Sequence, residues 1–172
     1  MKSLKVFSII AMAITVVSIV SCNNKNQANP NLTKAVVGTY EGTLTTDNLK
    51  GTSPATADIS AVNDYTVQIH CYGDDIDTTF MLELYEDGNT MRVCFTDEDF
   101  YSQYGHGKSE QHHMMGNSGN WTNWSQHMGN DHGQGDQHYG YFNMSDHQFN
   151  YTFNIDITEG NTYTQEFSGI LQ

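Results

Sequence analysis

The sequence predicts an all-β fold of about eight antiparallel strands, because apolar and polar residues alternate over most of the chain. The alternation is clearest over residues 149–157, where every odd position is apolar and polar residues stand between. Short turn sequences, such as Asn63-Asp64 and Glu159-Gly160-Asn161, separate several of the alternating segments. No segment beyond residue 22 has a helical apolar period. Strands of this kind bury one face by closing into a barrel or by packing as a sandwich.

The alternating segments place the strands, in order, near residues 36–46, 56–62, 65–72, 78–86, 90–96, 140–144, 149–157 and 163–171. In the first segment Gly38 and Gly42 flank Tyr40, which suits a strongly bent strand that closes against the last one. Outside the N-terminal segments and one long insertion, roughly 95 residues remain for these strands, which is enough for one modest core.

Two cysteines lie within the predicted strands. Cys71 shares the apolar face of its strand with Val67 and Ile69, whereas Cys94 shares the outer face of its strand with Arg92. In one meander these strands lie two apart and the two side chains point to opposite faces, beyond the short reach of a disulfide. We therefore expect two separate thiols.

Three segments resemble a known family. They are Val37-Gly38-Thr39-Tyr40-Glu41-Gly42-Thr43-Leu44 in the first strand, Ala57-Asp58-Ile59 in the second and Gln165-Glu166-Phe167-Ser168-Gly169 in the last. They resemble the calycin-like (lipocalin-like) β-barrel lipoproteins common in Bacteroidetes, and the resemblance covers residues 36–172 apart from the insertion. It implies a small closed antiparallel β-barrel whose two ends meet, and it brings no catalytic residues.

The N-terminus has the layout of a secretory signal peptide over residues 1–21. Two lysines precede an apolar run over residues 6–20, which is shorter than the roughly 20 residues that a membrane-spanning helix needs. Ile19-Val20-Ser21-Cys22 resembles the bacterial lipobox, which implies cleavage before Cys22, acylation of Cys22 and anchoring in a membrane. No Asp follows Cys22, which for such lipoproteins favours the outer membrane, facing the periplasm. Residues 22–35 are polar and are expected to form a flexible tether.

The chain is strongly acidic, with a net charge of −13. Removal of residues 1–21 would take away Lys2 and Lys5, leaving five Lys and Arg against all 20 acidic residues and a net charge of −15. Nucleic acids are poor partners for such a chain, because phosphate binding needs clustered Lys and Arg. Metal cations are attracted to it.

The alternation stops over residues 97–138, which form a long insertion rich in Gly, Asn, Gln, His and Met. Seven of the eight histidines of the chain fall between His106 and His147. Imidazole binds Cu(II), Zn(II) and Ni(II), and the soft thioether of Met favours Cu(I). The insertion therefore predicts metal binding, of copper in the first place and of zinc or nickel in the second. The candidate ligands are His106, His112, His113, Met114, Met115, His127, Met128, His132 and His138.

The ligand spacing matches neither a zinc finger nor the His-Glu-x-x-His motif, so we expect several exchanging sites on a flexible loop. A polar surface loop in which His is incidental is the alternative. Trp121 and Trp124 are unusual in a disordered segment and are expected to fold back onto the barrel.

No catalytic motif is present, so we do not expect an enzyme. Two further functions stay open. A calycin-like barrel can carry or sense a small apolar ligand, although inward Phe80, Phe95, Tyr151 and Phe153 look numerous enough to fill the interior. Alternatively, the insertion can bind a partner protein of the cell envelope.

Overall fold

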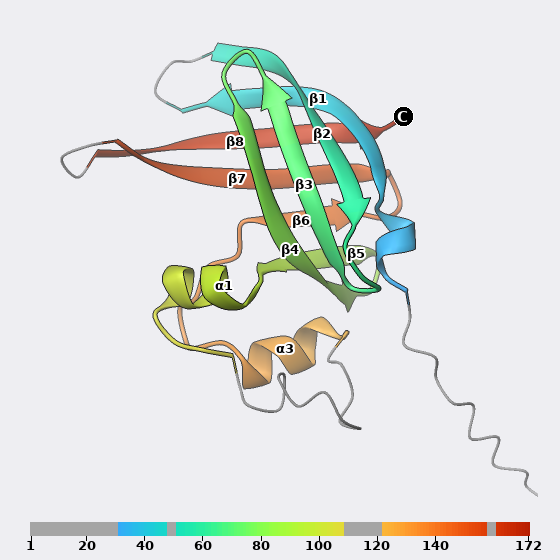
Figure 1. Ribbon diagram of the computed structural model, residues 1–172, viewed down its shortest axis with the longest axis vertical. Helices are drawn as coiled ribbons and strands as arrows, with labels where there is room; N and C mark the ends of the chain where they lie inside the picture. Colours follow the sequence, from blue (N-terminus) through green and yellow to red (C-terminus); the bar gives the residue numbers. More distant parts are fainter. Residues whose placement is uncertain (1–30, 48–50, 109–121, 158–160) are drawn as a thin grey trace, which may run out of the picture.

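Alternating segments with one apolar face can bury that face only against one another, and here they do so by closing into a ring. The computed structural model describes residues 31–47, 51–108, 122–157 and 161–172, and its eight strands form a closed antiparallel barrel (Figure 1). The strands are β1 (Gly38–Thr46), β2 (Gly51–Ala61), β3 (Thr66–Gly73), β4 (Asp77–Asp87), β5 (Thr90–Phe95), β6 (Gly140–Asn143), β7 (Gln148–Ile157) and β8 (Asn161–Leu171). The predicted fold class and all of the predicted strands are confirmed.

Each strand pairs with the next one along the chain, and β8 pairs with β1 to close the barrel. At this seam Gly42 lies opposite Gly169, and a Cβ atom at Gly42 would overlap the carbonyl oxygen of Ser168. The close approach of the two backbones therefore requires a glycine. This confirms the expectation that the first strand closes against the last.

Large apolar side chains fill much of the barrel interior, and buried Val36 belongs to this core at the end where the N-terminal segment enters. Tyr40, Leu44, Phe149 and Phe167 are each at most 2 % exposed, and the Tyr40 hydroxyl donates to the carbonyl of Val36. A short 3-10 helix, η1 (Thr33–Ala35), lies at this end, and its neighbour Leu32 is buried in the same core. The ordered domain thus includes residues 31–35, which the sequence placed in the tether.

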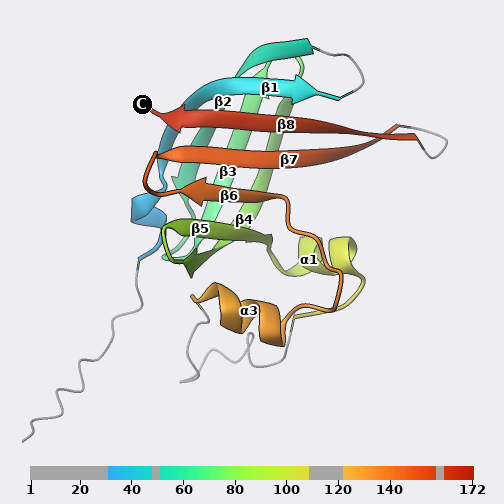
Figure 2. The same ribbon diagram turned by 180° about the vertical axis from the view of Figure 1, so that it is seen from behind.

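The described part of the insertion carries two short helices, α1 (Asp97–Tyr104) and α3 (Trp124–Asn130), where we expected a flexible loop without helices. Both lie outside the barrel beside the β4–β5 hairpin, with α3 against β4 and α1 against β5 (Figures 1 and 2). The physical reason is a second hydrophobic core, in which Tyr85 and Cys94 on the outer face of the hairpin pack against Phe100 of α1. The described part of the insertion is therefore a packed cover on the barrel wall.

The two cysteines are free thiols on opposite sides of the barrel wall, as expected: Cys71 lies in the barrel core and Cys94 in the second core. Trp124 folds back as expected and packs against Tyr85 and under the guanidinium of Arg92. Trp121 lies outside the described residues. Among the helices of the described residues, none has the length and apolar character needed to cross a membrane.

Candidate metal centre

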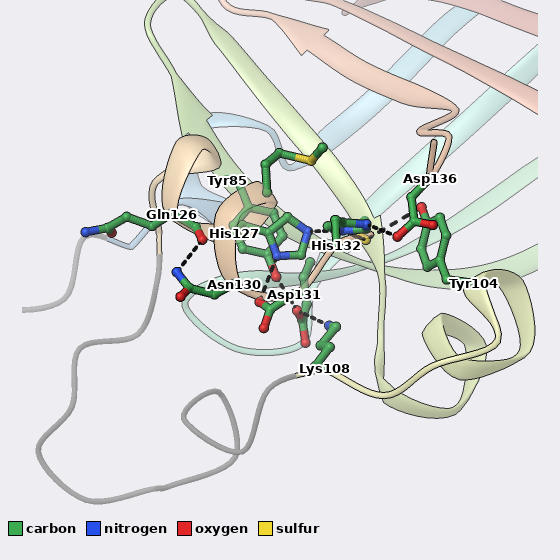
Figure 3. Close-up of polar contacts among 12 residues, drawn as sticks. Tyr85, Tyr104, Lys108, Gln126, His127, Asn130, Asp131, His132 and Asp136 are labelled. Carbon is green, nitrogen blue, oxygen red and sulfur yellow. Dashed lines mark hydrogen bonds and ion pairs between the residues drawn. The ribbon is translucent and has the colours of Figure 1, made fainter. Parts of the chain in front are cut away.

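Three side chains with metal-binding donor atoms converge between β5 and the insertion. Cys94 points outward from β5, His127 lies on α3, and His132 follows α3. The Nε2 atoms of the two histidines are 2.8 Å apart, and Cys94 Sγ lies 3.6 Å from His132 Nε2. All three donor atoms lie within 4.8 Å of one another. In Figure 3 a dashed line joins the rings of His127 and His132, and a second line runs from His132 to Asp136. His127 is fully buried and Cys94 is 3 % exposed, so the cluster is screened from solvent. We call these three residues the Cys-His-His cluster.

Each histidine of the cluster is held by a carboxylate four residues further along the chain. His127 Nδ1 lies 3.0 Å from Asp131 Oδ2, and His132 Nδ1 lies 3.1 Å from Asp136 Oδ2. A carboxylate only accepts, so each Nδ1 must carry the proton, and each neutral ring then has its lone pair on Nε2. Two lone pairs facing each other at 2.8 Å repel, unless a proton or a metal cation lies between them. The carboxylates therefore turn both Nε2 atoms toward one shared position, which a proton or a metal cation can occupy.

A second pair of donor atoms lies beside the cluster. The Tyr104 hydroxyl donates to the carbonyl of Gln137 at 2.8 Å and thus accepts from Nδ1 of His138 at 2.9 Å. His138 Nε2 then carries a lone pair, and it lies 2.9 Å from the thioether sulfur of Met128. The rings of His132 and His138 are in edge contact, with 4.3 Å between their centroids. This imidazole–thioether pair borders the cluster and adds the thioether sulfur of Met128, a soft donor, to the donor atoms nearby.

Burial keeps the donor groups uncharged in the absence of a metal. Desolvation lowers the pKa of His132 to about 4, helped by the neighbouring His127, and desolvation followed by His132 lowers the pKa of His138 to about 4. Desolvation also lowers the pKa of His127 and raises the pKa of the Cys94 thiol to about 12. Protons thus compete weakly for the imidazoles, whereas a metal must displace the thiol proton in order to bind sulfur.

The surroundings of the cluster are largely aromatic. Tyr85 stacks on His127 with 3.8 Å between the ring centroids, and Phe100 lies 5.0 Å from His132. Glu83, which faces Cys94 across the β4–β5 ladder, accepts from the Tyr85 hydroxyl at 2.7 Å and forms an ion pair with buried Lys108. These contacts favour positions of the donor side chains in which a metal can bind them.

The structure brings together four of the predicted ligands, namely His127, Met128, His132 and His138. His106 stands apart, because both of its ring nitrogens face acceptors: Nε2 faces Asp136 and Nδ1 faces the carbonyl of Gly107. The hydrogen bond to Asp136 is the main reason that the pKa of His106 is raised, and neither ring nitrogen points toward the Cys-His-His cluster. The remaining predicted residues lie outside the described part of the chain: Cys22, His112, His113, Met114 and Met115.

Sequence reasoning missed Cys94 as a member of the site, although it placed this side chain correctly on the outer face of its strand. A signal for the histidines was present in two consecutive His-x-x-x-Asp spacings, His127 to Asp131 and His132 to Asp136. At the end of α3 this spacing lets Asp131, the C-cap residue, reach the ring of His127, whereas His132 and Asp136 meet in the irregular segment that follows α3. In both cases the carboxylate binds the ring as metal-binding histidines require.

A separate pocket of about 310 Å³ opens at the end of the barrel opposite η1. Phe80, Phe95, Tyr151 and Phe153 line it, so the expectation that these four side chains fill the barrel is wrong. They pack against one another, with 4.9 Å between the rings of Phe80 and Tyr151, yet they leave space at the mouth. The barrel is filled at one end only.

These observations define the class of the molecule: a closed eight-stranded antiparallel β-barrel with a buried cluster of metal-binding side chains on its outer wall. No protein-family model matches the sequence, and no curated protein is similar to it. A search of solved structures finds a protein described as EF1p2_mFAP2b, bound to DFHBI. The two chains are 14 % identical with a TM-score of 0.45, and the match covers 83 % of this chain and 98 % of the other.

Proposed function

We propose that this protein is a lipid-anchored protein of the bacterial cell envelope that binds a transition metal, with copper preferred, at the Cys-His-His cluster. One observation carries the proposal: Asp131 and Asp136 bind Nδ1 of His127 and His132, so that both Nε2 atoms point into one buried space beside Cys94 Sγ. Metal-binding histidines almost always donate their other ring nitrogen to a carboxylate or carbonyl in this manner.

The donor atoms favour copper among the metals. Thiolate, imidazole and thioether are soft or borderline ligands and discriminate against Ca²⁺ and Mg²⁺, which prefer oxygen. Two imidazoles with one thiolate, and a thioether such as Met128 close by, form a set that suits both oxidation states of copper. Zinc is the next candidate and nickel the third, because imidazole and thiolate accept them as well.

The buried position of the cluster supports a role in holding, buffering or handing on the metal. Catalytic metal sites keep a coordination position open for water or substrate. Here Tyr85, Phe100 and Trp124 cover the histidines of the cluster. We therefore propose a binding protein and not an enzyme.

The cellular location rests on the sequence. The lipobox-like Ile19-Val20-Ser21-Cys22 supports acylation at Cys22 and an anchor in the outer membrane, and residues before Asn31 would tether the barrel in the periplasm. Cys22→Ala should move the protein from the membrane fraction to the soluble fraction. Retention of the variant in membranes after a high-salt wash would contradict the lipid anchor.

Copper titration of protein purified without a His-affinity step tests the proposed site. Wild type should bind Cu(II) tightly and show an intense visible charge-transfer band from the copper–thiolate bond. Cys94→Ser should lose the band, and the double variant His127→Asn, His132→Asn should lose the tight binding. His70→Asn is a matched control, because His70 also binds a carboxylate, Asp77, but lies exposed on another strand. Equal copper affinity in wild type and the double variant would refute the site.

The pocket at the barrel mouth favours a second candidate function, the carriage of a small apolar molecule. Its volume of about 310 Å³ lies at the lower end of the range of ligand pockets, roughly 300–1,000 Å³. The two functions do not exclude each other, since the pocket and the cluster use different side chains.

A further inference from the structure

The wall between the pocket and the metal-binding side chains is one residue thick. At three places, two neighbouring residues of the chain contribute to different sites. The first-named residue of each pair below belongs to the metal-binding side chains or contacts them, and the second lines the pocket. The pairs are Cys94 and Phe95, Tyr104 and Gln103, and His138 and Tyr139. Movement of one site therefore moves the backbone of the other.

Helix α1 connects the two sites most directly. Tyr104, its last residue, receives the hydrogen bond of His138 and lies 3.9 Å from Cys94 Sγ, while Phe100 packs on His132. Gln103, between them in sequence, lines the pocket and donates to the Tyr139 hydroxyl at 3.2 Å. One side of α1 thus packs on the metal-binding side chains and another forms part of the pocket wall.

The lining of the pocket defines the chemistry of its ligand. Five aromatic rings and two isoleucines, Ile76 and Ile155, supply an apolar surface that suits a flat ring system. Polar side chains at the rim, among them Gln103, Tyr139 and Asn154, are uncharged and offer a few hydrogen bonds. The described side chains that line the pocket include no Lys or Arg, and the chain has a net charge of −13, so an anionic ligand is disfavoured.

We propose that the pocket binds a small uncharged aromatic molecule and that metal at the Cys-His-His cluster raises its affinity through α1. The proposal rests on the proposed metal site. A metal that fixes Cys94 and His132 also immobilises Phe100 and Tyr104 packed against them, so the ordering of α1 is already in place when the aromatic ligand arrives. The coupling is reciprocal: the aromatic ligand raises the affinity for the metal by the same factor.

Fluorescence titration with N-phenylnaphthylamine, an uncharged aromatic probe, tests the proposal on the mature chain with and without saturating Cu(II) or Zn(II). The metal should tighten binding of the probe by about 5-fold or more, the lower end of ordinary allosteric coupling. Zn(II) guards against quenching of the fluorescence by copper. Anilinonaphthalene sulfonate, which adds an anionic group to the same ring system, should bind more weakly.

Three variants assign the effect to the pocket and to α1. Thr78→Trp fills the pocket and should abolish probe binding while metal binding, which also reports folding, persists. Tyr104→Phe removes the hydroxyl that joins α1 to His138, and it should reduce the effect of metal on the probe without removing either site. Tyr101→Phe is the matched control, because Tyr101 lies on the same helix and is 61 % exposed.

The outcomes are distinguishable. Equal probe affinity with and without metal, in protein that binds both, would refute the coupling and leave the proposed metal function standing. Absence of metal binding to the wild type would refute the proposed function and the coupling together. Probe binding that survives Thr78→Trp unchanged would place the ligand elsewhere and overturn the pocket assignment.

Discussion

At the scale of single residues, the proposed metal binding depends on which ring nitrogen of each histidine carries the proton. His127 and His132 are ordinary histidines in the sequence, and it is the carboxylates of Asp131 and Asp136 that direct their lone pairs toward each other. His106 has the same side chain, but both of its ring nitrogens face acceptors, and the hydrogen bond to Asp136 raises its pKa. The role of each histidine therefore follows from its partners.

Replacement of the carboxylates tests this role. Asp131→Asn and Asp136→Asn each remove an acceptor that fixes the proton on Nδ1, so each should lower metal affinity by about 10-fold to 100-fold. Competition with a chelator of known affinity measures the change. Asp77→Asn, which removes the carboxylate partner of exposed His70, should leave the affinity unchanged. An unchanged affinity in the Asp131 and Asp136 variants would show that the carboxylates do not support a metal site.

The lowered histidine pKa values predict a loss of stability of the metal-free protein in weak acid. The unfolded chain takes up protons on His132 and His138 near pH 6.5, whereas the folded chain takes them up only near pH 4. The free energy of unfolding should thus be level above about pH 6.5 and fall as the pH drops toward 4, by about 1–2 kcal/mol for each group after solvent screening. His106, with its raised pKa, opposes the trend in part.

Urea unfolding at a series of pH values measures this dependence. The range between pH 6.5 and 5 is the informative one, because ordinary carboxyl groups titrate near pH 4. His138→Gln should flatten the curve in this range. A wild-type curve that is already flat there would contradict the burial of neutral histidines.

At the scale of elements, the helices α1 and α3 are stabilised by packing against the outer face of the β4–β5 hairpin. Each helix buries a single residue completely, Phe100 in α1 and His127 in α3. Neither could be stable alone at this length. The cover and the metal site form one cooperative unit, since Phe100 contacts the rings of both cluster histidines.

Phe100→Ala tests that unit. Removal of a buried Phe side chain usually costs about 3–5 kcal/mol, more than two short helices can lose and remain packed. Amide hydrogen exchange should therefore show loss of protection in α1 and α3 and retention of protection in β1 and β8, together with weaker metal binding. Tyr101→Ala on the exposed side of α1 is the control. Equal loss of protection throughout the barrel would show that cover and barrel unfold together.

At the scale of the whole molecule, two hydrophobic cores lie on opposite faces of the β4–β5 hairpin. The barrel core closes around Tyr40, Leu44 and Phe167 and depends on the β1–β8 seam, while the second core depends on the outer face of β4 and β5. Closure of the ring pairs each of the described strands with a neighbour on both sides, which protects a β-protein from edge-to-edge association.

Gly42→Ala tests closure of the ring. The new methyl group would overlap the Ser168 carbonyl, so the seam must open slightly, and the free energy of unfolding should fall by about 1–3 kcal/mol. Gly107→Ala introduces the same methyl group where nothing lies within 4 Å, and it should leave the stability nearly unchanged. Thermal unfolding of both variants gives the comparison. Equal stability of the two variants would mean that the seam tolerates a side chain.

The sequence by itself determined the antiparallel strands, because a strand with one apolar face shows local alternation of apolar and polar residues. Alternation left a barrel and a sandwich open, and the resemblance to calycin-like proteins implied the closed barrel that the structure has. It also determined that Cys71 faces inward and Cys94 outward, since the period of two assigns the face of every strand residue. It marked the histidines and methionines by composition, and four of the nine candidate ligands converge. These features depend on residues close together in the chain, so the order of the residues is enough to predict them.

Only the tertiary structure decided that the insertion is a packed cover and that Cys94 belongs with His127 and His132. Sequence periodicity could not show this, because each short helix buries one residue and leaves no apolar stripe. The partners are also remote: Cys94 and His132 stand 38 residues apart in the chain. They come together because the insertion packs over Tyr85 and Cys94 on the outer face of the β4–β5 hairpin. The open pocket likewise depends on how the aromatic rings that line it pack. Such packing is a property of the whole molecule and has no signature in any one segment.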